Sequence, residues 1–212
     1  LAYIFIEASL RKTDLKKLLH NNIESTFNSI SVDGDTSTSD TIMIFATGLK
    51  NSKIKMSKNL FNLLSRGVHD VMLSLSKQIV SDGEGISKLI EVKVTGAKNK
   101  TQASNVAFSI AESILVKTAI AGEDANWGRV IMAIGKSDKN IVQNKIIISF
   151  NNLVVTNKGA AYPKINIKKL NSYMKNKIIK INVDLGIGKY YKKVWSSDLT
   201  HDYVSINADY RS

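Results

Sequence analysis

Apolar residues recur at two different spacings along the chain. Between residue 57 or 59 and residue 79 they return every three or four positions, which is the spacing of one face of a long helix. The same spacing predicts shorter helices over 13–27, 101–114 and about 165–174. Apolar and polar residues instead alternate over 90–95 and 179–185, as expected for half-buried strands. The mixture predicts a layered α/β (α+β) fold with helices packed on mixed β-sheets.

The first eight residues read as a strand. Leu1 to Ile6 are all apolar, which predicts a strand covered on both faces. The chain begins inside this strand and without Met, so it is either an arbitrary fragment or the product of a cleavage just before a core strand. The second alternative has a chemical meaning, because a newly exposed terminal amine can act as the base for a hydroxyl nucleophile beside it.

Composition narrows the class of protein. The chain has 212 residues, 43% of them hydrophobic, with no internal repeat or linker, which predicts one continuous unit over 1–212; an alternative has a smaller C-terminal subdomain from about residue 140. The absence of cysteine excludes disulfides and thiolate metal sites and suits a reducing compartment, so we expect a cytoplasmic protein. His20, His69 and His201 lie far apart, so we expect no metal. No apolar run approaches the ~20 residues of a membrane helix, so we expect no membrane partner.

The formal charge of +12 leaves a basic nucleic-acid-binding module as a non-enzyme alternative. The lysines, however, are spread through the chain, and only four residues are arginine, the side chain better suited to phosphates and bases. The charge is therefore interpreted as a solvated surface, and we expect no nucleic-acid partner.

Three polar stretches stand out as candidate sites. Residues 31–41, SVDGDTSTSDT, form a loop rich in hydroxyls and carboxylates after Ile30. Glu84 lies between two glycines in DGEG, where flexible backbone lets other groups approach; it is either an ordinary turn or a carboxylate for a cationic ligand. Residues 122–129, GEDANWGR, include Asn126 as a helix cap and Arg129 as a partner for Glu123 or Asp124.

Five stretches in the right order resemble the β chain of ornithine acetyltransferase, also called glutamate N-acetyltransferase. They are LAYIF at 1–5, ISVDGDTSTSDT at 30–41, DGEG with KLIEVKVTGA within 82–97, LVKTAIAGEDANWGR at 115–129 and DLTHDYVSINADYRS at 198–212. The resemblance implies an N-terminal-nucleophile-like fold and a precursor that cleaves itself before a threonine. The α and β chains would stay together as an α2β2 heterotetramer. The nucleophilic threonine is then expected just upstream of Leu1, so no catalytic residue is named in this chain.

The chemistry that the resemblance implies is a ping-pong transfer of acetyl from N-acetylornithine to glutamate, with acetyl-CoA as a further co-substrate in some members and no resident cofactor. Three residues carry over as substrate-pocket groups: Glu84, Asn207 and Ser212, the last replacing a commoner threonine. Asp33, Asp35, Thr36 and Arg129 are expected to shape the site structurally, and the oxyanion-hole donors are expected on the α chain. A self-processed aminopeptidase of related fold is the enzymatic alternative.

Overall fold

The computed structural model describes residues 1–48 and 56–210, and they form two compact units. Unit 1 contains Leu1–Ile30 and Asp35–Gln78, and unit 2 contains Ser31–Gly34 and Ile79–Ser212. Residues from about 140 onward supply strands to the same sheet as β4 (Leu89–Ala97), within unit 2. Whether the natural chain is completed by a separate partner stays a prediction.

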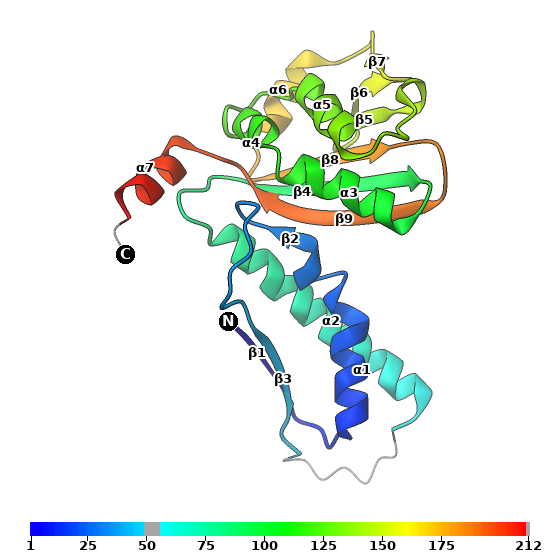
Figure 1. Cartoon of the computed structure of the whole chain (residues 1–212), viewed down its shortest axis with the longest axis vertical. Helices are drawn as coiled ribbons and strands as arrows, with labels where there is room; N and C mark the ends of the chain where they lie inside the picture. Colours follow the sequence, from blue (N-terminus) through cyan, green and yellow to red (C-terminus); the bar gives the residue numbers. More distant parts are fainter. Residues whose placement is uncertain (49–55, 211–212) are drawn as a thin grey trace. The chain divides into compact units, whose positions relative to one another are not determined.

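Unit 1 is built on two parallel strands, β1 (Ala2–Ile6) and β3 (Ile42–Ala46), with Ile4 opposite Ile44 (Figure 1). Its helices are α1 (Lys12–Ile23), the 3-10 turn η1 (Phe27–Ser29) and α2 (Lys58–Ser81). The last residues of α2, from Ile79 onward, belong to unit 2. Ile4 packs with Val68 and Met72 of α2 in a small apolar core. The long helix expected from residue 57 or 59 is confirmed.

Within this chain the first strand is covered on one face only, so the expectation of cover on both faces is not met by the chain itself. Ala2 and Ile4 are buried, whereas Tyr3 is 49% and Phe5 66% exposed. Successive side chains of a strand point to opposite faces, so an apolar run alone does not decide whether one face or both are covered. On the exposed face Phe5 stacks on Phe45, with ring centroids 5.1 Å apart.

The second sheet is mixed, in the order β2-β9-β4-β8-β5-β6-β7, and all of its strands from β4 onward belong to unit 2 (Figure 1). β4 pairs in parallel with β8 and antiparallel with β9. The remaining strands are β2 (Ile30–Ser31), β5 (Ile147–Phe150), β6 (Leu153–Asn157), β7 (Ala160–Ala161), β8 (Ile178–Asp184) and β9 (Tyr190–Ser197). The predicted alternation is confirmed, because Ile90, Val92 and Val94 are fully buried while Lys93 is exposed.

Helices of unit 2 pack on the buried face of this sheet. α3 (Lys100–Ala111) lies against β4 and β9, and α4 (Ile114–Ala121) and α5 (Trp127–Ser137) pack on α3. The others are η2 (Gln143–Lys145), α6 (Ile167–Met174) and α7 (His201–Asp209). The Asn126 cap is confirmed, but α3 is capped by Asn99 instead of Thr101. The amide oxygen of Asn99 accepts from the N–H of Gln102, which satisfies an end-of-helix donor two residues earlier than the pattern indicated.

The predicted class, α/β with helices packed on a mixed sheet, is therefore confirmed. Among the residues described, no single helix has both the length and the apolar composition to cross a membrane; α3 and α4 together meet those criteria as a pair bent by 51°. Both helices contribute to the core of unit 2 through Val106, Ile110 and Val116.

Candidate functional site

The DGEG loop lies between α2 and β4, and it holds Glu84 in an exposed position. Gly85 follows with a positive φ of +61°, a region that glycine adopts without steric cost. A Cβ atom on Gly85 would stand 2.4 Å from the backbone nitrogen of Tyr203. The loop is therefore packed directly against the first turn of α7, and glycine is required by both conformation and space.

The start of α7 is fastened to the same loop. The hydroxyl of Thr200 donates to the carbonyl oxygen of Gly85 and caps the helix by accepting from the N–H of Tyr203 at 3.3 Å. One turn later the Asn207 amide donates to the carbonyl oxygen of Tyr203 at 2.9 Å, on an exposed stretch of the helix. The structure thus brings the segments that carry Glu84 and Asn207 together, although they are far apart in sequence. Ser212 lies outside the described residues.

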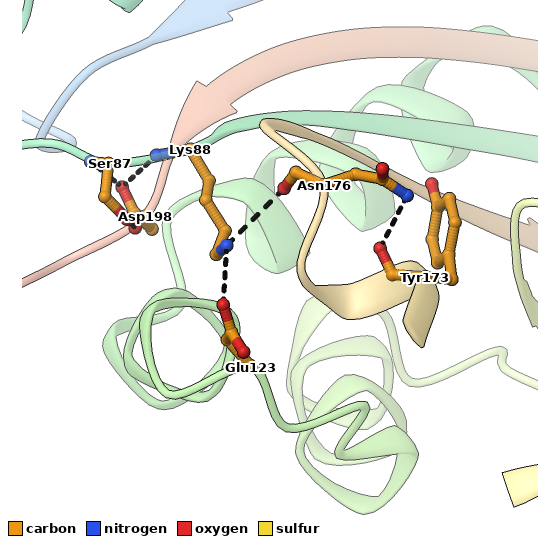
Figure 2. Close-up of polar contacts among 6 residues, drawn as sticks. All are labelled: Ser87, Lys88, Glu123, Tyr173, Asn176 and Asp198. Atoms are coloured by element: carbon orange, nitrogen blue, oxygen red, sulfur yellow. Dashed lines mark hydrogen bonds and ion pairs between the residues drawn. The ribbon is translucent and has the colours of Figure 1, made fainter. Parts of the chain in front are cut away.

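Asp198 joins the two segments where β9 ends and β4 begins. Its Oδ1 accepts from the backbone N–H groups of Ser87 at 2.8 Å and Lys88 at 3.0 Å, and its Oδ2 accepts from the Ser87 hydroxyl at 2.5 Å (Figure 2). Its own N–H donates to the Lys88 carbonyl at 3.1 Å, which continues the β4–β9 pairing by one residue. Asp198 is 1% exposed, so this carboxylate relies on protein donors in place of water.

Lys88 connects this junction to the GEDANWGR loop. Its ammonium is 3.3 Å from Glu123 Oε1 and donates to the Asn176 carbonyl at 3.5 Å; the Asn176 amide in turn donates to the Tyr173 carbonyl (Figure 2). The expectation that Arg129 pairs with Glu123 or Asp124 is wrong. The Arg129 guanidinium donates to the Leu115 carbonyl at 2.9 Å and to the Thr118 hydroxyl at 3.2 Å, because α5 directs it back along α4.

Lys117 of α4 bonds the first residues of the polar loop, which belong to unit 2. Its ammonium donates to the carbonyl oxygen of Val32, and its backbone oxygen accepts from the N–H of Leu199 at 3.3 Å. Lys117 is only 4% exposed, and burial lowers its pKa, an effect opposed by the negative charges of Asp33, Asp198 and Glu112. Asp33 thus contributes to the electrostatic environment of Lys117. Asp35 and Thr36 belong to unit 1, and their role stays a prediction.

Asp198, Lys117 and Lys88 are the residues that sequence reasoning missed. The available signal was their place within or next to the stretches that carry the resemblance, since Asp198 begins DLTHDY and Lys117 lies in LVKTA. Each is buried, and each bonds at least one backbone atom of a distant segment. Spacing along the chain contains no information about such partners.

Two exposed side chains of this region are of the kinds that bind small polar ligands. Glu84 presents a carboxylate to solvent and Asn207 presents an amide that can both donate and accept, on two backbone segments fixed to one another. A carboxylate favours an ammonium group, and an amide favours the head group of an amino acid.

Comparison with known proteins identifies relatives over the whole chain. The model of the ArgJ family matches residues 1–212. The arginine biosynthesis bifunctional protein ArgJ of Brucella suis biovar 1 (strain 1330) is 44% identical over 221 residues, and that of Bradyrhizobium diazoefficiens (strain JCM 10833 / BCRC 13528 / IAM 13628 / NBRC 14792 / USDA 110) is 45% identical over 217. Each comparison covers 100% of this chain and 52% of the relative, so the chain spans about half the length of these relatives.

A solved structure agrees with the fold. The crystal structure of arginine biosynthesis bifunctional protein argJ from Bacillus halodurans superimposes with a TM-score of 0.92 at 39% sequence identity, over 99% of both chains. The sequence resemblance to the acetyltransferase family is thereby confirmed, as is the kind of fold that it implied.

Proposed function

The chain belongs to the ArgJ family, and on that premise we propose that it is one of two pieces of an acetyltransferase of arginine biosynthesis. The enzyme moves acetyl from N-acetylornithine to glutamate, and acetyl-CoA is a further acetyl donor. It works in the cytoplasm as an α2β2 assembly of two chains from one precursor. The half-length coverage of the relatives supports a precursor of about twice this size.

The proposed chemistry uses a threonine hydroxyl just upstream of Leu1. Its oxygen attacks the acetyl carbonyl carbon, the terminal amine takes the hydroxyl proton, and the amide C–N bond breaks to release ornithine as an amine. The amine of glutamate then attacks the resulting acetyl ester, which restores the hydroxyl and yields N-acetylglutamate. Donors that stabilise the oxyanion belong to the companion chain.

In this scheme the residues of the present chain bind substrate. Glu84 pairs with a substrate ammonium, and Asn207 bonds the amino-acid head group, with Ser212 as a third contact. The observation that carries the proposal is the joining of their two segments, through Thr200 on Gly85 and Asp198 on Ser87 and Lys88. Two groups that hold one small substrate must be fixed relative to each other, and this arrangement supplies that condition.

The exposed face of β1 and β3 is evidence in favour of a companion chain. Phe5 and Phe45 stack there, and Tyr3 and Met43 are 49% and 37% exposed. An apolar strand face of this kind is stabilised when another layer covers it. We assign that layer to the half of the precursor that this chain lacks.

An acetyl-transfer assay on the natural full-length protein tests the proposal. Ornithine and N-acetylglutamate should form together from N-acetylornithine and glutamate, and intact mass spectrometry should find two chains that divide before a threonine. Changing Glu84 to Ala should raise the KM for N-acetylornithine by about tenfold or more, because one charged contact is lost. An unchanged KM would remove Glu84 from the site.

The same assay separates the alternatives. A self-processed aminopeptidase would release its acyl group to water in the absence of glutamate. A basic nucleic-acid-binding module would bind DNA or RNA with an affinity that falls steeply as salt increases, with no acetyl transfer.

A further inference from the structure

We propose that Asp198 is a positioning residue that fixes Glu84 and Asn207 relative to each other through its bonds to Ser87 and Lys88. The inference rests on the proposed function, because it concerns how the substrate groups are held. Asp198 itself is buried and touches neither Glu84 nor Asn207 by any hydrogen bond that the described residues show. We name the two segments that it joins, residues 84–88 and 198–203, the site junction.

Asp198 sets the path of the chain that enters β4. The pairing of Leu89 with Ser197 fixes the strands, but Glu84 lies five residues before that pair in a loop with no helix or strand of its own. Asp198 extends the order upstream by accepting from two successive backbone N–H groups and one hydroxyl. Three bonds to a single carboxylate, in a place sheltered from water, define the path of the backbone at Ser87 and Lys88.

Asp198 also lies close to the start of α7 in the chain. Asp198 precedes the helix by only two residues of backbone, Leu199 and Thr200, and the Thr200 hydroxyl bonds the carbonyl oxygen of Gly85. The loop that carries Glu84 is therefore held at two points. The Thr200 hydroxyl bonds Gly85, the residue after Glu84, and the Asp198 carboxylate bonds Ser87 and Lys88. Without the Asp198 carboxylate the two segments lose these bonds to each other, and the separation of Glu84 and Asn207 changes.

A buried polar residue elsewhere in unit 2 distinguishes positioning from simple stability. Thr156 of β6 is also fully buried, and its hydroxyl accepts from the backbone N–H of Ile148 at 2.9 Å. It stabilises the same unit of the fold at a strand pair that is not part of the site junction. Thr156→Val is therefore a matched control that lowers stability without altering the junction.

The test compares Ser87→Ala, Asp198→Asn, Asp198→Ala and Thr156→Val in the natural full-length protein. KM and kcat for N-acetylornithine are measured together with the melting temperature. Asp198→Asn keeps an oxygen for the two N–H groups but loses the negative charge that strengthens all three bonds. Ser87→Ala removes one of the three bonds. Both variants should therefore raise KM severalfold. Asp198→Ala should raise it about tenfold or more, while Thr156→Val lowers the melting temperature and leaves KM unchanged.

Hydrogen exchange gives a readout that does not depend on activity. In Asp198→Asn the amides of residues 84–88 and 199–203 should exchange about tenfold faster than in the wild type, and in Thr156→Val they should not. Unchanged exchange and an unchanged KM in both Asp198→Asn and Ser87→Ala would overturn the proposal, even if Asp198→Ala fails to fold. If the wild-type protein transfers no acetyl group, the proposed function fails, and the exchange data still decide whether Asp198 holds the junction.

Discussion

Gly85 lies so close to Tyr203 that a methyl group on its α-carbon would stand 2.4 Å from the Tyr203 backbone nitrogen and 2.6 Å from the carbonyl carbon of Asp202. Real side chains do not approach backbone atoms this closely, so one of the two segments would have to move. The second glycine of DGEG therefore serves the packing of the loop on α7. Glu84 depends on that packing for its place.

The first prediction is that Gly85→Ala destabilises unit 2 and weakens substrate binding. The left-handed backbone alone should cost about 1–3 kcal/mol for a residue with a Cβ, and the clash with Tyr203 adds to that cost. Urea denaturation measures the loss of stability, and the KM for N-acetylornithine measures the displacement of Glu84.

Gly135→Ala is the control for this change. Gly135 is an exposed residue inside α5, and a Cβ there would have no atom within 4 Å. Alanine is the better helix former, so this variant should gain about 0.5–1 kcal/mol with no change in KM. Equal effects of the two substitutions would refute the assignment of Gly85 to the contact with α7.

The second prediction concerns the ion pair of Lys88 and Glu123. Lys88 has a side chain only 8% exposed, so Glu123→Gln leaves a buried ammonium with the Asn176 carbonyl as the remaining acceptor that the structure shows. Glu123 is itself 43% exposed, and water screens part of the interaction, so the expected cost is about 1 kcal/mol. Thermal or urea unfolding measures it.

A double-mutant cycle checks the cause of that cost. Lys88→Met keeps the apolar stem and removes the charge that needs a partner, so it should change stability by less than about 1 kcal/mol. In the Lys88→Met background, Glu123→Gln should then cost nothing measurable. A full cost in both backgrounds would mean that Glu123 stabilises the loop by another route.

Local periodicity predicted much of the fold, and particular residues show where it stops. The alternation of Ile90, Val92 and Val94 with polar residues placed β4 correctly, because burial of one face follows from the period of a strand. The run at 1–6 did not reveal that Phe5 is exposed, since the number of layers on a sheet is a property of the whole assembly. Asn99 in place of Thr101 shows how a capping residue depends on where the chain leaves β4.

The sequence named exposed candidate groups for the site and did not name the buried residues that support them. Glu84 and Asn207 were named from motifs, and the structure joins their segments. The bonds of Asp198 to Ser87 and Lys88 connect residues more than a hundred positions apart, and they involve backbone donors that every residue except proline possesses. Such contacts are decided by the topology of β4 and β9 and leave no pattern in the sequence.

The third prediction tests the exposed face of β1. Phe5→Glu places a charge beside Phe45 on an apolar surface that the proposed companion chain covers, so the two chains should separate more readily in the natural protein. Native mass spectrometry at increasing salt measures retention of the companion. Tyr191→Glu on β9, where the tyrosine is 72% exposed, is the matched control and should leave the assembly intact. Identical retention in both variants would show that the companion does not use this face.

The last prediction is a dependence of stability on pH that originates at Lys117. Burial lowers the pKa of this lysine below its ordinary 10.5 in the folded protein, whereas the unfolded chain keeps the ordinary value. Between the two values the unfolded chain binds more protons than the folded one. The contribution of Lys117 to the free energy of unfolding therefore rises with pH through that window, by at most about 1.4 kcal/mol per pH unit.

Lys117→Met isolates this contribution, because the other lysines titrate alike in both proteins. The Val32 carbonyl keeps the Ser197 hydroxyl as a donor at 3.3 Å, so the variant should still fold. Urea denaturation of wild type and variant from pH 7 to about 10.5 should show the wild type gaining stability relative to the variant as pH approaches 10.5. A difference that stays constant with pH would mean that Lys117 titrates alike in the folded and unfolded chains, and that Asp33, Asp198 and Glu112 offset its burial in full.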